Sequence, residues 1–185
     1  MNFVDLGIPG AFIVEPRVLT DPRGTFVKTF AEATFAARGL PTDWREEFHS
    51  SSRRGVVRGM HFQTPPADHA KLVFCIAGAV HDVVLDLRRG SPTFGQHRSV
   101  ELDARHGTGL FIPRGCAHGF VSTSDWSTMY YKVTSAHSPE HDRGIAWDSF
   151  GHDWSIANPV LSDRDRTHPP LSDFDSPFTM TGTAK

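Results

Sequence analysis

The side chains best suited to chemistry lie in two short blocks of the sequence. The first block contains His61 and Gln63 and is followed by Lys71, and the second block ends at His118. A neutral imidazole titrates near pH ~6.5 and can take up a proton at physiological pH. A lysine ammonium can stabilise negative charge that develops on a substrate. We therefore expect a pocket that removes a proton and stabilises the resulting anion.

The residues around these side chains follow a known spacing. Gly55 precedes His61 by six positions, Gly78 follows Lys71, and residues 113–118 have the pattern Pro-x-Gly-x-x-His. This frame is similar to the two metal-binding blocks of cupin barrels, in which His-x-His, a Glu and a later His are the ligands. Here Gln63 and Lys71 replace two of the ligands, and a cation disfavours a bound divalent metal. We expect neither a metal nor another cofactor.

The elements that must position these groups read mainly as strands. Residues 11–15 and 25–30 are expected to form strands, and residues 31–38 a short helix. Further β-rich segments, separated by turns, are expected at residues 56–62, 71–76, 80–87, 97–102, 109–112, 119–122 and 128–134. This spacing predicts an all-β fold, a cupin-type jelly roll or antiparallel sandwich with a few short helices. Strand alternation places Tyr131 inside the barrel, opposite to Lys132, and places Lys71 among apolar neighbours.

Composition indicates one globular domain. The chain has 185 residues, 38% hydrophobic and 22% charged, with a net charge of −2. We expect a single domain over residues 1–168 and a loose Ser/Pro/Asp-rich tail over residues 169–185. The weak charge favours neither nucleic acid nor a membrane as partner. Without a signal-peptide pattern, and with Cys75 and Cys116 in apolar surroundings, we expect a cytoplasmic protein with buried thiols.

Several linked blocks resemble one enzyme family, the dTDP-4-dehydrorhamnose 3,5-epimerases. The resemblance covers most of residues 13–165 in the same order. Its blocks are residues 54–63, 70–73, 81–88, 90–96, 112–120, 131–132, 143–148 and 161–165. The family implies a metal-free cupin that acts on a nucleotide-linked 4-keto-6-deoxyhexose. It also implies a homodimer that exchanges N-terminal strands.

The resemblance implies a role for each matching residue. His61 resembles the general base, Asp165 the carboxylate that orients it, Lys71 the group near the C4 carbonyl and Tyr131 the general acid. Substrate contacts are implied for the remaining matching positions, which are Arg23, Phe26, Ser50, Arg58, Gln63, His118 and Arg143. Of these, Arg58 matches a diphosphate contact, and Arg23 and Phe26 match nucleotide contacts made by the partner subunit.

The sequence departs from the family pattern at the nucleotide end. Lys28, Glu46, Phe48 and Ala136 stand where other residue types are common in the family. These differences leave open whether the nucleotide is thymidine, and whether carbon 3, carbon 5 or both are inverted. The alternatives are an acid–base isomerase or cyclase on a non-nucleotide carbonyl compound, a metal-dependent cupin, and a catalytically silent sugar-binding module.

Overall fold

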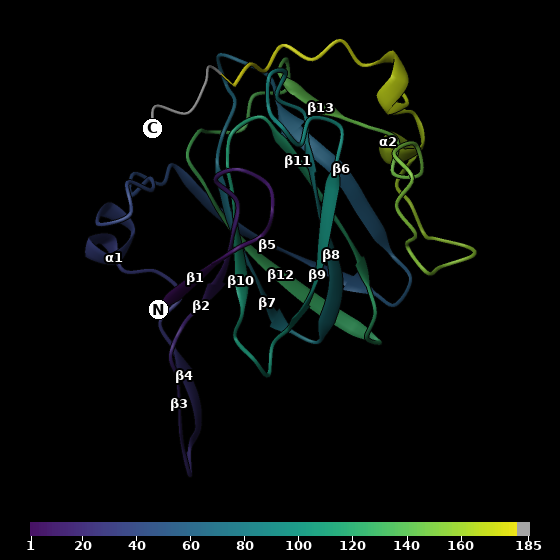
Figure 1. Ribbon diagram of the computed structural model, residues 1–185. Helices are drawn as coiled ribbons and strands as arrows, with labels where there is room; N and C mark the ends of the chain where they lie inside the picture. The colour runs from purple at the N-terminus through teal and green to yellow at the C-terminus, as the bar shows by residue number, and fades with distance from the viewer. Residues whose placement is uncertain (181–185) are drawn as a thin grey trace.

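The computed structural model describes residues 1–180, which form two antiparallel sheets packed face to face with a small additional hairpin (Figure 1). The first sheet contains, in spatial order, β1 (Asn2–Asp5), β2 (Phe12–Glu15), β10 (Gly109–Ile112), β7 (Lys71–Ala77), β12 (Trp126–Val133) and β5 (Glu46–Arg53). The second contains β13 (Asp142–Gly144), β6 (Val57–Gln63), β11 (Cys116–Ser122), β8 (Ala79–Asp86) and β9 (His97–Asp103). The predicted all-β jelly roll is confirmed.

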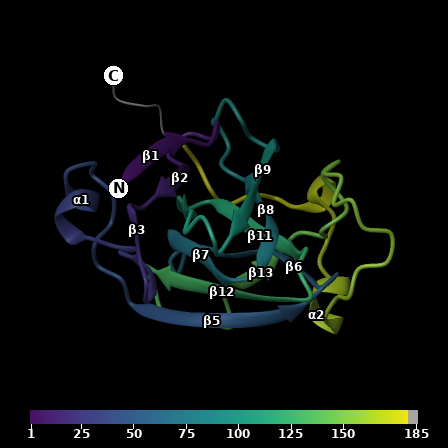
Figure 2. The ribbon, with the colours of Figure 1, turned by 90° about the horizontal axis from the view of Figure 1, so that it is seen from below.

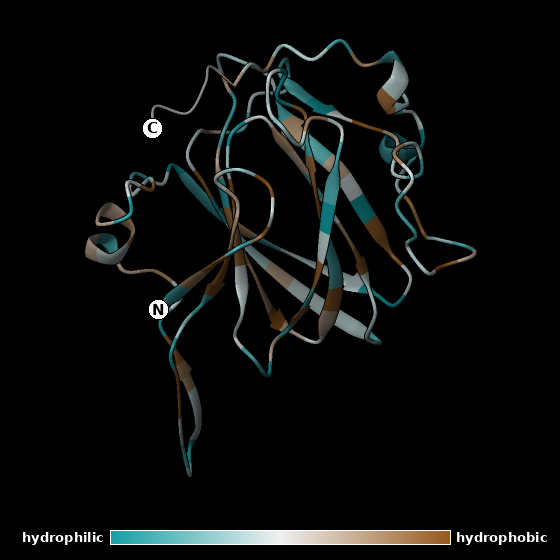
Figure 3. Ribbon diagram, viewed as in Figure 1, coloured by the Kyte–Doolittle hydropathy of each residue, from teal (hydrophilic) through white to brown (hydrophobic). Residues whose placement is uncertain are grey.

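The main core lies between the two sheets. Val73 and Met129 from the first sheet meet Val84 and Phe120 from the second, and all four are buried. Alternation along β12 sends Met129, Tyr131 and Val133 inward, as predicted. Apolar and polar segments accordingly alternate along many strands (Figure 3).

The outer face of each sheet has its own cover. Phe35 of α1 (Glu32–Ala36) packs with Phe74 and Phe111 outside the first sheet. The C-terminal segment, residues 145–180, covers the outside of the second sheet, and its Trp154 is buried. Every residue of β11 is therefore buried, since this strand has protein on both faces.

The C-terminal segment differs from the expected loose tail. Phe178 is only 5% exposed and its ring lies 5.7 Å from that of Phe62. Thr179 forms a β-bridge with Arg89, and the Ser176 hydroxyl donates to the carbonyl of Leu87. Burial of an isolated aromatic side chain orders this Ser/Pro/Asp-rich stretch through residue 180. The rest of the predicted tail, residues 181–185, lies outside the described part of the chain.

Strands β3 (Val18–Asp21) and β4 (Gly24–Val27) form the hairpin, which projects away from the body in Figure 1 and points toward the viewer in Figure 2. The second strand of this hairpin ends at Val27, three residues before the predicted end at 30. Phe26 is 61% exposed on it. Two short helical turns, α2 (Asp163–Arg166) and the 3-10 turn Leu171–Asp173, lie in the C-terminal segment. No helix within residues 1–180 has the length and apolar character needed to span a lipid bilayer.

Candidate active site

A cavity of about 290 Å³ opens between the two sheets. Both sheets contribute to its wall, because His61 lies on β6 and His118 on the adjacent β11, whereas Lys71 begins β7 and Tyr131 lies on β12. The predicted residues that line it are Ser50, Arg58, His61, Gln63, Lys71, His118 and Tyr131. The fold therefore brings together side chains from strands that are far apart in the sequence.

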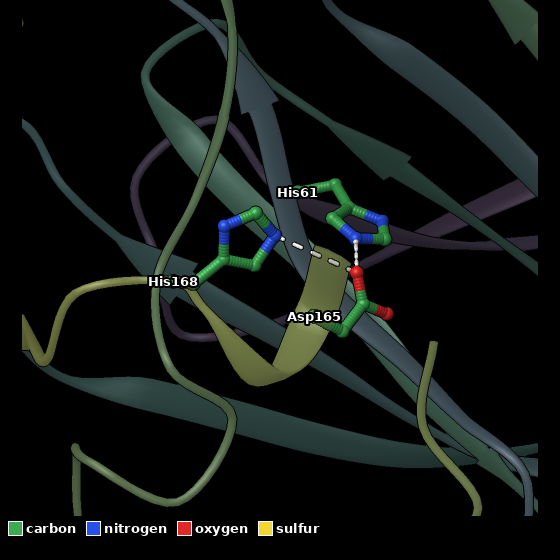
Figure 4. A group of neighbouring side chains, drawn as sticks. All are labelled: His61, Asp165 and His168. Carbon is green, nitrogen blue, oxygen red and sulfur yellow. Dashed lines mark hydrogen bonds and ion pairs between the residues drawn. The ribbon is translucent and has the colours of Figure 1, made fainter. Parts of the chain in front are cut away.

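Asp165 lies behind His61 and is bonded to it. Its Oδ1 is 2.7 Å from Nε2 of His61, and its Oδ2 accepts a hydrogen bond of 3.3 Å from the backbone N–H of Gly59. The local sequence sets this position, because Ser162 caps α2 and its hydroxyl accepts from the backbone N–H of Asp165 at 3.1 Å. Figure 4 shows the carboxylate aimed at the ring of His61.

The electrostatics of this pair fix the tautomer of His61. Although burial opposes it, the neighbouring imidazoles of His168 and His61 hold the pKa of Asp165 well below its usual range. An ionised carboxylate can only accept hydrogen bonds, so Nε2 of His61 must carry the proton. Nδ1 then keeps a free lone pair. Burial also lowers the pKa of His61, against the opposing effect of Asp165, which favours the neutral imidazole.

Lys71 is a buried cation in the wall of the cavity. Its Nζ donates a hydrogen bond of 3.0 Å to the backbone carbonyl of His61. Burial lowers its pKa to about 8, while Asp142 and Asp82 act in the opposite direction. Lys71 therefore remains mostly charged at neutral pH and lies next to His61. It is buried at the start of β7, among the apolar neighbours that strand alternation predicted.

Tyr131 is a buried phenol on the same sheet as Lys71 and on the sheet opposite to that of His61. Its ring stacks on Phe48, with centroids 4.8 Å apart and planes 16° apart, and meets the ring of His118 at 5.9 Å. Burial raises the pKa of Tyr131 above its usual value, so the phenol stays protonated. Tyr131 therefore carries a proton at neutral pH, which a general acid must have before it reacts.

The side chains of His118 and Gln63 are fixed by hydrogen bonds to other protein groups. Nε2 of His118 lies 3.0 and 2.9 Å from the two carboxylate oxygens of buried Asp82. The Gln63 amide donates to the carbonyl of Ala67 at 2.8 Å and accepts from the N–H of Ser138 at 2.6 Å. His61, Gln63, Lys71 and His118 stand at the four ligand positions of a cupin barrel. An amide and a cation at two of these positions do not fit a bound metal.

The mouth of the cavity holds charged residues that the sequence analysis missed. Arg164 donates to Asp142 at 2.7 Å, and His137 lies 3.2 Å from the other oxygen of that carboxylate. Arg164 directly precedes Asp165 in the sequence, and this closeness to a predicted site residue could have identified it. Asp142 was overlooked in favour of Arg143, which is exposed and does not line the cavity. Neighbouring residues of a strand face opposite sides of the sheet, so a shift of one residue in the three-residue strand β13 decides whether Asp142 or Arg143 faces the cavity.

Two further predicted residues lie elsewhere in this chain. Arg23 pairs with Asp21 at the exposed tip of the β3–β4 hairpin, and Phe26 lies on the same hairpin. Both line a shallow hollow on the hairpin instead of the cavity. Their expected role depends on a second subunit, so it stays a prediction.

Comparisons with known proteins agree on one family. The family model described as dTDP-4-dehydrorhamnose 3,5-epimerase matches residues 5–173. A protein of that name from Shigella flexneri is 41% identical over 168 residues, or 89% of this chain and 93% of its own.

Solved structures extend the likeness to the whole fold. The Legionella pneumophila dTDP-6-deoxy-D-glucose-3,5-epimerase, in complex with dTDP-4-keto-L-rhamnose, is 32% identical with a TM-score of 0.93, covering 98% of this chain and 99% of its own. A 3'-monoepimerase from Streptomyces bikiniensis, in complex with dTDP-quinovose, is 34% identical with a TM-score of 0.85, covering 90% and 86%.

Proposed function

Because the chain belongs to the dTDP-4-dehydrorhamnose 3,5-epimerase family, we propose that it inverts carbon 3, carbon 5 or both of a dTDP-linked 4-keto-6-deoxyhexose in deoxysugar biosynthesis. The observation that carries this proposal is the set of groups around one cavity. A histidine oriented by a buried carboxylate, a buried lysine and a buried tyrosine are the parts that an acid–base epimerisation needs.

In the first step of the proposed reaction, His61 acts as the general base. A proton next to a ketone is weakly acidic, and its removal leaves an enolate. Nδ1 of His61 takes this proton, and the Asp165 carboxylate stabilises the imidazolium that forms. Lys71 then stabilises the negative charge on the C4 oxygen, in a cavity where burial strengthens electrostatic interactions. No metal is needed for either step.

In the second step, Tyr131 acts as the general acid. Inversion requires that the new proton arrive on the face opposite to the one from which the first left. His61 belongs to the second sheet and Tyr131 to the first, so the two groups approach the cavity from opposite walls. Tyr131 delivers its proton to the enolate carbon. Exchange with solvent then returns a proton to Tyr131 and removes one from the His61 imidazolium.

The nucleotide end is assigned to Arg58 and to a second subunit. Arg58 is oriented by donating to the Ser52 hydroxyl at 3.0 Å and to the Ser51 carbonyl at 3.1 Å, and its charge suits a diphosphate.

We include a homodimer in the proposal, in which the projecting hairpin of each subunit brings Arg23 and Phe26 to the other's cavity. Sedimentation equilibrium tests it, and a monomeric mass would contradict it. A cytoplasmic location, consistent with the free thiols of Cys75 and Cys116, belongs to the same proposal.

Proton exchange tests the proposed function. The protein is incubated with dTDP-4-keto-6-deoxyglucose in deuterated water, and NMR follows deuterium at carbons 3 and 5. We expect label at one or both carbons, loss of label in His61→Asn, and normal label in His106→Asn, where the histidine is exposed. No label with the wild-type protein would reject this substrate, and retained exchange in His61→Asn would reject the base.

A further inference from the structure

His168 is a buried histidine that the proposed reaction does not use. Its side chain is 10% exposed, and its Nε2 lies 3.5 Å from Oδ1 of Asp165. The contact with Asp165 is long for a hydrogen bond, and this nitrogen, which is shielded from solvent, has no other partner among the described residues. A buried polar atom that is only partly satisfied is unfavourable, so this arrangement requires an explanation.

The backbone around His168 is shaped to admit its ring. A Cβ atom placed on Gly144 would lie 2.3 Å from Nε2 of His168, so any larger residue at this position would displace the imidazole. Gly144 pairs with His61 in the β13–β6 ladder. The strand that flanks the proposed base therefore also leaves room for the second histidine, and Figure 4 shows both rings aimed at the same carboxylate.

We propose that His61, Asp165 and His168 form a binding site for a zinc ion, and that zinc bound there inhibits the enzyme. One ligand atom from each residue lies within 4.8 Å of the other two. Two imidazole nitrogens and a carboxylate oxygen form a common ligand set for zinc, with solvent as the fourth ligand. This site shares His61 with the cupin metal position, but its other two ligands, Asp165 and His168, are not part of the cupin set.

Two of the three ligand spacings are near those of a tetrahedral site, and the third, between the nitrogens of His61 and His168, is at most 4.8 Å. With zinc about 2.0–2.1 Å from each ligand, ligand atoms are roughly 3.3–3.5 Å apart. The His168–Asp165 pair already has this spacing at 3.5 Å. The His61–Asp165 pair, at 2.7 Å, has to open by about 0.6 Å. The positive charges of Lys71 and Arg164 both act on His61 and oppose a bound cation. Arg164 is paired with Asp142, and the Asp165 carboxylate offsets part of the charge of the ion itself.

Inhibition follows from the tautomer of His61. Zinc would bind Nε2 and displace the proton there, and a neutral imidazole then carries its proton on Nδ1. Nδ1 is the atom that accepts the substrate proton in the mechanism above, so a metal-bound His61 cannot act as the base. This inhibitory effect rests on the proposed function, whereas zinc binding itself does not.

Calorimetric titration of chelator-treated protein with zinc chloride tests the binding. We expect one equivalent to bind to the wild type, and affinity to fall at least ~100-fold in His168→Gln, which keeps a polar side chain but removes a ligand. The matched control is His137→Gln, which removes a histidine at the cavity mouth that also faces a carboxylate. It should bind zinc like the wild type. No binding to the wild type, unchanged affinity in His168→Gln, or loss only in His137→Gln would each overturn the site.

The exchange assay tests the inhibition separately. Stoichiometric zinc should suppress exchange by the wild type and a chelator should restore it, whereas His168→Gln should keep its own zinc-free rate at the same zinc concentration. Equal suppression in both proteins would overturn the inhibitory role. If the protein shows no exchange at all, the proposed function fails and calorimetry still decides the site. If His168→Gln does not fold, anomalous scattering from zinc-soaked wild-type crystals decides, and a peak anywhere but among the three ligands refutes it.

Discussion

Replacement of Asp165 by asparagine should leave the shape of the site intact and remove its base. The backbone N–H of Gly59 donates to Oδ2 of Asp165, so the amide oxygen of the new side chain would take that place. The amide N–H₂ then faces His61 and donates to Nε2, which moves the imidazole proton to Nδ1. The free lone pair that the reaction needs is lost.

The size of the effect follows from the role of the pair. Asp165 is 4% exposed and its bond to His61 is 2.7 Å long, so no solvent replaces it. A positioned general base contributes about 10²–10⁴-fold to a rate. Loss of the base should therefore lower kcat by about that factor, which is roughly 3–5 kcal/mol at ~1.4 kcal/mol per tenfold. KM should change little, because Asp165 does not line the cavity.

Single-turnover deuterium exchange on dTDP-4-keto-6-deoxyglucose measures this loss directly. The matched control is Asp163→Asn, an exposed carboxylate on the same helical turn, which should stay within about twofold of the wild type. Melting temperatures show whether each variant is folded. If folded Asp165→Asn kept more than about a tenth of the wild-type rate, the assignment of Asp165 as the orienting group would be wrong.

Three further substitutions test the acid, the pH response and the C-terminal cover. Tyr131→Phe should keep proton exchange by the base but reduce formation of inverted product about 10²–10⁴-fold, measured by NMR of the product. Burial, together with His97 and His81, lowers the pKa of His152 to about 4. The unfolded chain therefore binds more protons as pH falls from about 6.5 to 4, and the free energy of unfolding should decrease over that window. His152→Phe should flatten this decrease in urea titrations, and an unchanged slope would contradict it. Phe178→Ala should lower the free energy of unfolding by about 3 kcal/mol, and a loss below ~1 kcal/mol would show that the C-terminal segment is not part of the core.

The barrel strands were predictable because their side chains alternate around apolar runs. The same alternation placed Tyr131 and Lys71 inside. Strand β5 was missed because it lies at a sheet edge and carries mostly polar residues, so it lacks an apolar signal. Phe178 was missed because one aromatic residue in a polar stretch does not reveal what it packs against.

The position of His168 was not predictable from the sequence for a different reason. Its closeness to Asp165 along the chain suggests a turn, but its burial depends on Gly144, more than twenty residues earlier. The helical turn after Ser162 brings Asp165 to His61, and the glycine admits the second ring. Three-dimensional packing therefore brings a second imidazole to the His61–Asp165 pair, which the sequence alone did not reveal.

Burial prepares the base and the acid of the site at the same pH. Because burial disfavours charge, it lowers the pKa of His61 and raises that of Tyr131. At neutral pH the base is therefore neutral and the acid is protonated, as each must be before a substrate proton moves. Lys71 keeps its charge there because Asp142 and Asp82 counteract part of its desolvation. The charge that develops on a substrate oxygen thus meets a cation already in place, in a cavity where burial strengthens the attraction.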